Sequence, residues 1–120
     1  MTEHPTPLHA LYGRWLEDLW NGDPSVAAEI VTPDFVGHWP DREVHGPGEL
    51  AAAVRETHEM FDGVSFTREV GPFVDGDMVA GRWTGSGQLP QGTARFIGND
   101  ILRARGGLFA EYWVATVVLS

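Results

Sequence analysis

The stretch that decides the fold is Arg95-Phe-Ile-Gly-Asn-Asp-Ile-Leu-Arg-Ala-Arg105, followed by Gly106-Gly107 and Leu108-Phe-Ala-Glu-Tyr-Trp113. Alternate residues of a strand point to opposite faces of a sheet, so one face of the first arm carries Phe96, Gly98, Asp100, Leu102 and Ala104. Asp100 is the one charged residue on this apolar face. A carboxylate placed there is costly unless it is paired, hydrogen-bonded or held neutral, so Asp100 is either a structural anchor or a chemical group.

The two-residue period extends outward from this stretch to four predicted strands, at residues 64–74, 78–88, 95–105 and 108–119. Upstream, apolar residues recur at three- and four-residue steps and predict helices at 7–20, 24–31 and 47–61, with a short strand at 35–39 and a loop at 40–48. Helices followed by an antiparallel meander are typical of an α+β fold. Gly81, Gly85 and Gly87 inside one strand indicate a strongly curved sheet. We therefore expect a cone-shaped barrel in which three N-terminal helices cover a mostly antiparallel sheet.

Composition narrows the possible functions. The 120 residues predict a single domain spanning 1–120, of which 1–6 form a loose polar leader. The net charge of -9 argues against nucleic acid and anionic membranes as partners. Because Cys and Lys are absent, thiol chemistry and Schiff-base catalysis by a side chain are excluded. No secretion signal or membrane span is visible, so we expect a cytoplasmic protein.

Several motifs together resemble a known family. They are Asp34-Phe-Val-Gly-His38, Gly46-Pro-Gly-Glu49, Asp75-Gly-Asp-Met-Val-Ala-Gly-Arg-Trp-Thr-Gly-Ser-Gly87, Asn99-Asp-Ile-Leu-Arg103 and Glu111-Tyr-Trp113. In this order they are similar to SnoaL-like proteins of the nuclear transport factor 2-like superfamily, which includes polyketide cyclases and ketosteroid isomerases. The resemblance implies a deep, mainly apolar pocket and a homodimer formed through the sheet. Function varies widely within such a fold.

The resemblance carries over only part of a catalytic set. Asp100 aligns with the aspartate that stays protonated in ketosteroid isomerases and donates a hydrogen bond to the substrate oxygen. Trp15 and Trp39 stand where those isomerases have a tyrosine and the aspartate base. Ala115 replaces an acid expected in epoxide hydrolases, and the segment after Gly87 is shorter than usual.

Two histidines are candidate proton acceptors beside Asp100. His38 ends the short strand, but alternation places it and Trp39 on opposite faces, so only one of the two points inward. His58 shares a helical stripe with Leu50, Val54 and Phe61, where a hydrogen-bonded core histidine is the alternative interpretation. His4, His9 and His45 lack metal-ligand spacing, so we expect no metal and no cofactor.

Aromatic residues on several predicted elements are expected to line one cavity and bind a flat or hydrophobic ligand: Tyr12, Trp15, Trp39, Phe61, Trp83 and Trp113. Filling the core is the alternative. The sequence thus predicts a cofactor-free acid–base enzyme, of the cyclase, isomerase or dehydratase type, for a small hydrophobic or aromatic carbonyl metabolite of polyketide or other natural-product biosynthesis. A non-catalytic ligand-binding or dimerisation domain is the alternative function.

Overall fold

The computed structural model describes residues 7–119, so the predicted leader at 1–6 lies outside the described residues. Its elements are α1 (Pro7–Gly13), continued by a π-helical segment (Arg14–Trp20), a 3-10 turn (Pro24–Val26), α2 (Ala27–Ile30), β1 (Val31–His38), β2 (Glu43–His45), α3 (Gly46–Met60), β3 (Val64–Asp75), β4 (Met78–Leu89), β5 (Gly92–Arg105) and β6 (Leu108–Val118). All four predicted C-terminal strands are present. The predicted helices are present as well, although the second is short.

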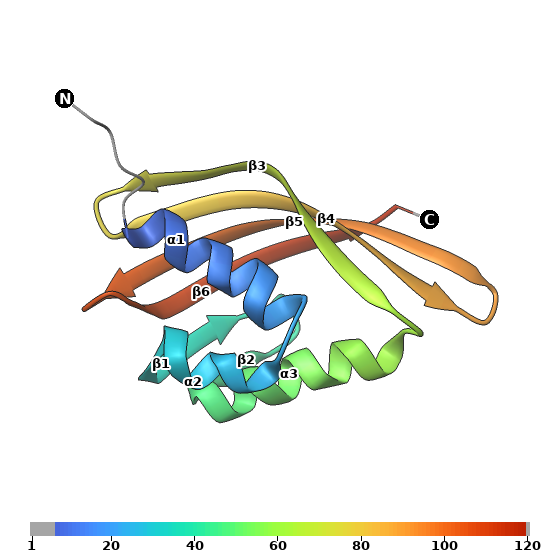
Figure 1. The fold of residues 1–120 in the computed structure, drawn as a ribbon, viewed down its shortest axis with the longest axis horizontal. Coiled ribbons are helices and arrows are strands. Elements are labelled where there is room, and N and C mark those ends of the chain that lie inside the picture. Colours follow the sequence, from blue (N-terminus) through green and yellow to red (C-terminus); the bar gives the residue numbers. More distant parts are fainter. Residues whose placement is uncertain (1–6, 120) are drawn as a thin grey trace.

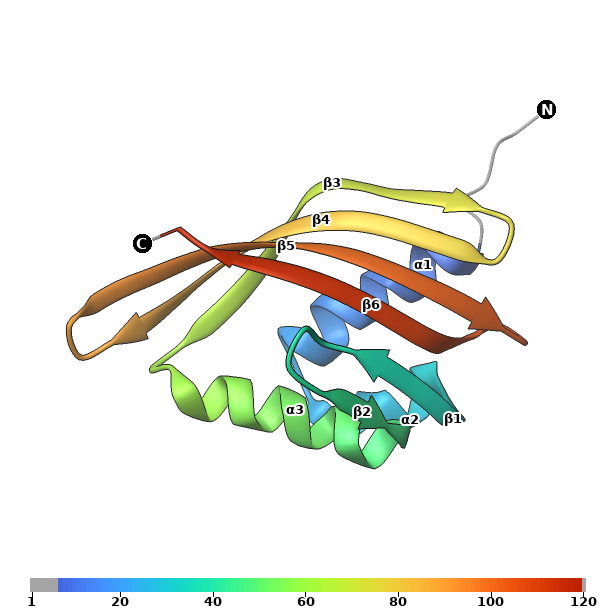
Figure 2. The same cartoon turned by 180° about the vertical axis from the view of Figure 1, so that it is seen from behind.

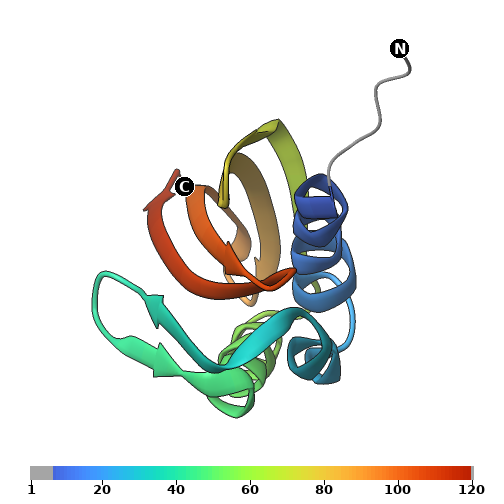
Figure 3. The same ribbon diagram turned by 90° about the vertical axis from the view of Figure 1, so that its left-hand side faces the viewer.

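The fold is α+β and its sheet is mostly antiparallel, as predicted. Its strand order is β2-β1-β6-β5-β4-β3, and only β1 and β6 run parallel. The long strands β3 to β6 form a curved layer with α1 along one side and α3 below it (Figures 1 and 2). The end-on view shows how far this layer curls around the helices (Figure 3). Since β2 and β3 remain the two edges among the described residues, the cone is open and does not close into a barrel.

Two local expectations about the N-terminal half were wrong. The short strand predicted at 35–39 starts earlier than expected, because β1 already begins at Val31 and pairs there with Phe109 of β6. The predicted loop at 40–48 contains β2, which pairs antiparallel with β1. Both strands are stabilised by the neighbouring sheet, which local propensity does not report.

A β-bulge near the start of β6 reverses its alternation. Arg103 pairs with Glu111 and Ala104 with Phe109, so Ala110 is an extra residue on β6. Phe109 and Tyr112 are consequently both buried, although they lie three positions apart. The core between the helices and the concave face of the sheet is largely aromatic, and one gap in it forms the candidate site.

Candidate functional site

A cavity of about 220 Å³ opens between the first helix, α3 and the concave face of the sheet. Its walls are mostly aromatic and aliphatic: Trp15, Leu16, Trp20, Trp39, Thr57, Phe61, Phe66, Trp83, Phe96, Asp100, Tyr112, Val114, Thr116 and Val118. Asp100 is the one acidic residue of this set, and no basic residue or histidine lines the cavity within the part of the chain that the structure describes. The cavity is therefore an apolar site with a single ionisable carboxyl group.

Three hydrogen-bond donors converge on the Asp100 carboxylate, which is 1% exposed. The Tyr112 hydroxyl donates to Oδ1 at 2.6 Å, and the Trp83 Nε1–H donates to the same oxygen at 3.0 Å. The Tyr12 hydroxyl donates to Oδ2 at 2.9 Å from α1. Donors of this kind favour the ionised form of a buried carboxyl group.

Two glycines of the concave face give these donors room. Gly81 pairs with Asp100 across β4 and β5, and a Cβ there would lie 2.9 Å from the Tyr12 hydroxyl. Gly98 pairs with Trp83, and a Cβ there would lie 2.2 Å from the indole ring. The two small residues thus allow Tyr12 and Trp83 to lie directly against the sheet and reach the carboxylate.

The Asn21 side chain fixes one wall of the cavity, because its amide group pairs with the backbone of β3 as a neighbouring strand would. The Asn21 amide donates to the Phe66 carbonyl at 2.6 Å and accepts from the Phe66 N–H at 2.7 Å. This pair attaches the end of the first helix to β3. It holds Trp20 and Phe66 in edge-to-face contact at 5.9 Å.

The environment raises the pKa of Asp100 from 3.8 to about 6. Desolvation is the dominant cause, and the hydrogen bonds from Tyr112, Trp83 and Tyr12 offset part of it. Burial and the nearby carboxylate raise the pKa of both tyrosines above 10.0, so each keeps its proton. At neutral pH most molecules therefore hold an ionised Asp100 surrounded by neutral donors.

Stability should depend on pH through Asp100. Because its folded-state pKa lies above the unfolded value, folding favours the protonated form, and this stabilisation is lost as the pH rises from about 4 through about 6. The difference corresponds to about 3 kcal/mol. We expect the free energy of unfolding of the wild type, relative to Asp100→Asn, to fall by most of this amount between pH 4 and pH 7.5. Urea titrations of both proteins at several pH values measure it, and a constant difference would contradict the shifted pKa.

The structure brings five of the predicted site residues to the cavity: Trp15, Trp39, Phe61, Trp83 and Asp100. Tyr12 is not among the lining residues, but its hydroxyl donates a hydrogen bond to the Asp100 carboxylate. Of the pair that alternation left open, Trp39 lines the cavity and His38 does not.

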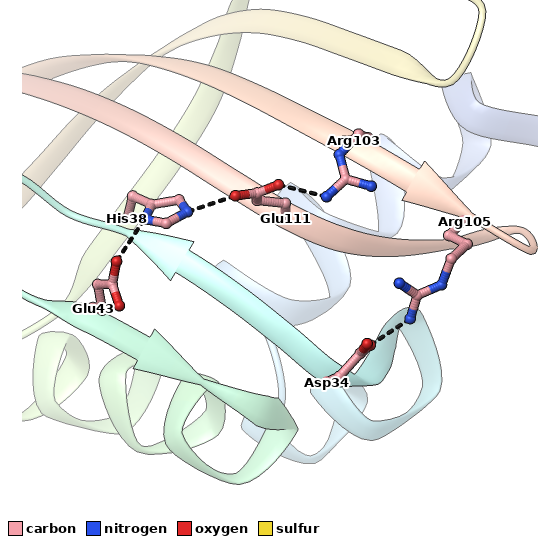
Figure 4. Close-up of polar contacts among 6 residues, drawn as sticks. All are labelled: Asp34, His38, Glu43, Arg103, Arg105 and Glu111. Carbon is pink, nitrogen blue, oxygen red and sulfur yellow. Dashed lines mark hydrogen bonds and ion pairs between the residues drawn. The ribbon is translucent and has the colours of Figure 1, made fainter.

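His38 belongs to a polar chain that crosses four strands (Figure 4). Its Nδ1 lies 3.1 Å from Glu43 on β2 and its Nε2 lies 2.7 Å from Glu111 on β6, which in turn accepts from Arg103 at 2.5 Å. Arg103 and His38 lower the pKa of Glu111. Arg105 and Asp34 form a second pair nearby (Figure 4). These contacts tie β2, β1, β6 and β5 together away from the cavity.

His58 and Trp113 also lie away from the lining residues. The His58 Nε2 is 2.6 Å from the Trp20 carbonyl, a contact that joins α3 to the first helix. Trp113 stacks on His38 with ring centroids 5.6 Å apart. The bulge at Ala110 explains the position of Trp113, because it turns Tyr112 toward the cavity and Trp113 to the opposite face.

Two aromatic residues of the site that carry a hydrogen-bond donor, Tyr112 and Trp20, were not among the predicted lining residues. Tyr112 was overlooked because strict alternation from Phe109 places it on the other face. Trp20 was not among the aromatic residues expected at the cavity, yet it lines the cavity, and its Nε1 is buried without a hydrogen-bond partner among residues 7–119. The available signal for Tyr112 was its position in the middle of the Glu111-Tyr-Trp113 motif.

No group of three or more His, Asp or Glu among residues 7–119 is placed to hold a metal ion. None of the helices formed by these residues is long and apolar enough to cross a membrane.

Comparison with known proteins agrees with this architecture. The profile of the SnoaL-like domain family matches residues 12–112. No curated protein matches the chain. A proposed polyketide cyclase from Bacillus cereus is 23% identical, with a TM-score of 0.82 over 92% of this chain and 74% of the other. A proposed SnoaL-like polyketide cyclase from a Jannaschia species is 19% identical, with a TM-score of 0.80 over 97% and 90%.

A third solved structure of the same fold carries a ligand. It is a protein with a ketosteroid isomerase-like fold from Catenulispora acidiphila in complex with trimethylamine. It is 17% identical, with a TM-score of 0.78 over 88% of this chain and 83% of the other. At these identities the three solved structures show only that this chain shares their fold.

Proposed function

Because the chain belongs to the SnoaL-like domain family, we propose that its aromatic cavity is the active site of a cofactor-free acid–base enzyme of the cyclase or isomerase type. The substrate is a small hydrophobic or aromatic carbonyl compound. Asp100 is the group that accepts and returns the proton. The observation that carries this proposal is the isolated, hydrogen-bonded carboxylate in an otherwise apolar cavity.

The ionisation of Asp100 supports a role as a base. A pKa of about 6 keeps the carboxylate mostly deprotonated at neutral pH and still basic enough to accept a proton in a water-poor site. This differs from the protonated donor that the resemblance to ketosteroid isomerases implied. In the proposed step, Asp100 takes a proton from the carbon beside the carbonyl group and returns it at another carbon or to the oxygen.

Trp20 supplies a candidate donor for the substrate oxygen. Its buried Nε1–H lacks a partner among the described residues, and its ring lines the cavity. An unsatisfied buried donor costs about 1–3 kcal/mol, which a bound carbonyl oxygen would recover. Negative charge that develops on that oxygen strengthens the same hydrogen bond.

The size of the cavity favours a small substrate. An apolar cavity of roughly 150 Å³ holds benzene in a well-studied protein core. A cavity of about 220 Å³ suits a compound with one ring or a short branched chain better than a compound with four fused rings. The trimethylamine complex of the C. acidiphila protein is consistent with small ligands in this fold.

The pH profile of a Tyr112→Phe variant tests the proposed base. The Tyr112 hydroxyl stabilises the Asp100 carboxylate at 2.6 Å, so its loss should raise the pKa of Asp100 above about 6. Because catalysis needs the ionised form, we expect the acidic limb of kcat/KM to move up by about one pH unit. A pre-steady-state or steady-state profile on any turned-over carbonyl compound measures this.

Tyr12→Phe is a second variant that tests the same assignment. It removes the donor to Oδ2 without changing a lining residue, so it should move the same limb in the same direction with little effect on KM. Acidic limbs that coincide in the wild type and both variants would contradict the assignment of Asp100 as the base.

A second candidate function is a binding domain without catalysis. Its support is that three protein donors already occupy the Asp100 carboxylate, as in a structural anchor, and that no second carboxyl group and no histidine lines the cavity in the described chain. Native mass spectrometry of the purified protein separates the two. A retained ligand that is released unchanged after long incubation favours binding alone, and its conversion favours the enzyme.

The homodimer through the sheet remains a prediction. Exposed apolar side chains support it on the face opposite the cavity, where Ile101 is 46% and Val117 is 56% exposed. Sedimentation velocity at micromolar concentration checks it, and a single monomeric species would contradict it.

A further inference from the structure

We propose that the cavity selects a small organic cation, an amine-bearing or quaternary ammonium compound, over a neutral compound of the same shape. The inference names the class of compound bound at the proposed site. It rests on the proposed function only for the statement that the compound is then converted. Three features of the cavity carry it.

The first feature is a closed circuit of aromatic rings. Trp15 contacts Trp20 at 6.3 Å, Trp20 contacts Trp39 at 6.3 Å, Trp39 contacts Tyr112 at 5.1 Å, and Tyr112 contacts Trp15 at 4.6 Å between ring centroids. The planes meet at 49–68°. All four rings line the cavity, so a ligand bound there lies against aromatic surface. The negative face of a Trp or Tyr ring attracts a cation, and Trp does so most strongly.

The second feature is a buried charge that lacks a counter-ion. Asp100 accepts three hydrogen bonds, but none of its donors is charged, and no ion pair to it exists within residues 7–119. A buried carboxylate is normally paired with a cation or coordinated to a metal. A cationic ligand beside Asp100 would complete the missing pair.

The third feature is the field of the whole chain. The net charge is -9, so cations are drawn toward the protein and anions are repelled. No basic side chain of the described chain lines the cavity to oppose this attraction. A bound cation would also hold Asp100 in its ionised form, which is the form that accepts a proton in the proposed reaction.

The test uses two probes that differ by one atom. Phenyltrimethylammonium and tert-butylbenzene have the same shape, and nitrogen in the first replaces a carbon in the second. Binding to the wild type is measured by calorimetry and by quenching of tryptophan fluorescence at pH 7.5. We expect the cation to bind at least about tenfold more tightly, in line with desolvated cation–π and ion-pair contacts.

Asp100→Asn should reduce this preference to less than about twofold, because the ion pair and its field are lost. Asp41→Asn removes the same charge from an exposed loop and should retain the preference. Trp39→Leu keeps the carboxylate and should weaken the cation by at least about fivefold while weakening the neutral probe less. This variant preserves the test if Asp100→Asn does not fold.

Equal or tighter binding of tert-butylbenzene to the wild type would overturn the inference. So would a preference that survives in both Asp100→Asn and Trp39→Leu. The outcome also separates the two proposals. If a neutral carbonyl compound is converted while the cation fails to bind, the inference fails and the proposed function stands. If the cation binds selectively and no amine-bearing carbonyl compound is converted, the inference stands and the proposed function fails.

Discussion

Asp100→Asn should abolish most of the turnover and leave the fold intact. General acid–base groups contribute about 10²–10⁴-fold to catalysis, so we expect kcat to fall by at least about 10²-fold. The fold survives because an Asn side chain has the same shape. Its Oδ1 can still accept from Tyr112 and Trp83, while its Nδ2 donates to the Tyr12 hydroxyl, which is also an acceptor. Steady-state kinetics and a thermal melt of the same preparation measure the two properties.

His38→Gln is the control for this loss of activity. His38 bridges Glu43 and Glu111 away from the lining residues, so its replacement should change kcat less than about threefold while lowering stability slightly. Retained turnover in Asp100→Asn, combined with its loss in His38→Gln, would place the base outside the cavity. That result would contradict the proposed site.

Gly98→Ala should destabilise the protein by about 2–4 kcal/mol. The added methyl group would lie 2.2 Å from the Trp83 ring, which cannot move aside freely because it packs between Phe66 and Phe96 and donates to Asp100. Either the ring shifts and the hydrogen bond is lost, or the strands separate. Urea denaturation followed by tryptophan fluorescence gives the free energy of unfolding.

Gly48→Ala is the matched control for that substitution. Gly48 lies in α3 with an ordinary backbone conformation and no atom within 4 Å of an added Cβ. The same methyl group should therefore be neutral or stabilise the protein by up to about 1 kcal/mol. Equal effects of the two substitutions would show that contact with Trp83 is not the cause, and would contradict the role given to Gly98.

Sequence periodicity predicted the strand that matters most. The face carrying Phe96, Asp100, Leu102 and Ala104 is buried from Phe96 to Ala104 of β5, and Asp100 lies within it. This succeeded because β5 keeps a regular register with β4 from Gly92 to Arg103. Where pairing is regular, the two-residue period of the side chains is a direct record of burial.

The same reasoning failed at β6, because a single extra residue reverses every side chain beyond it. Ala110 has no sequence signal of a bulge, since it is neither Gly nor Pro. Trp113 was consequently expected at the cavity and Tyr112 was not. The glycines of β4 were interpreted as bends, yet Gly81 makes room for the Tyr12 hydroxyl, a tertiary contact that local sequence does not encode.

The role of Asp100 in proton transfer is tested most directly by titrating Asp100 itself. Carbon-13 NMR follows its carboxyl carbon in the wild type, and the spectrum of Asp100→Asn identifies the signal. We expect the signal to titrate near pH 6 in the free protein and the midpoint to fall when phenyltrimethylammonium is bound. A midpoint below about 4 that no ligand changes would describe an ordinary structural carboxylate, and would contradict Asp100 as the proton-transfer group of the cavity.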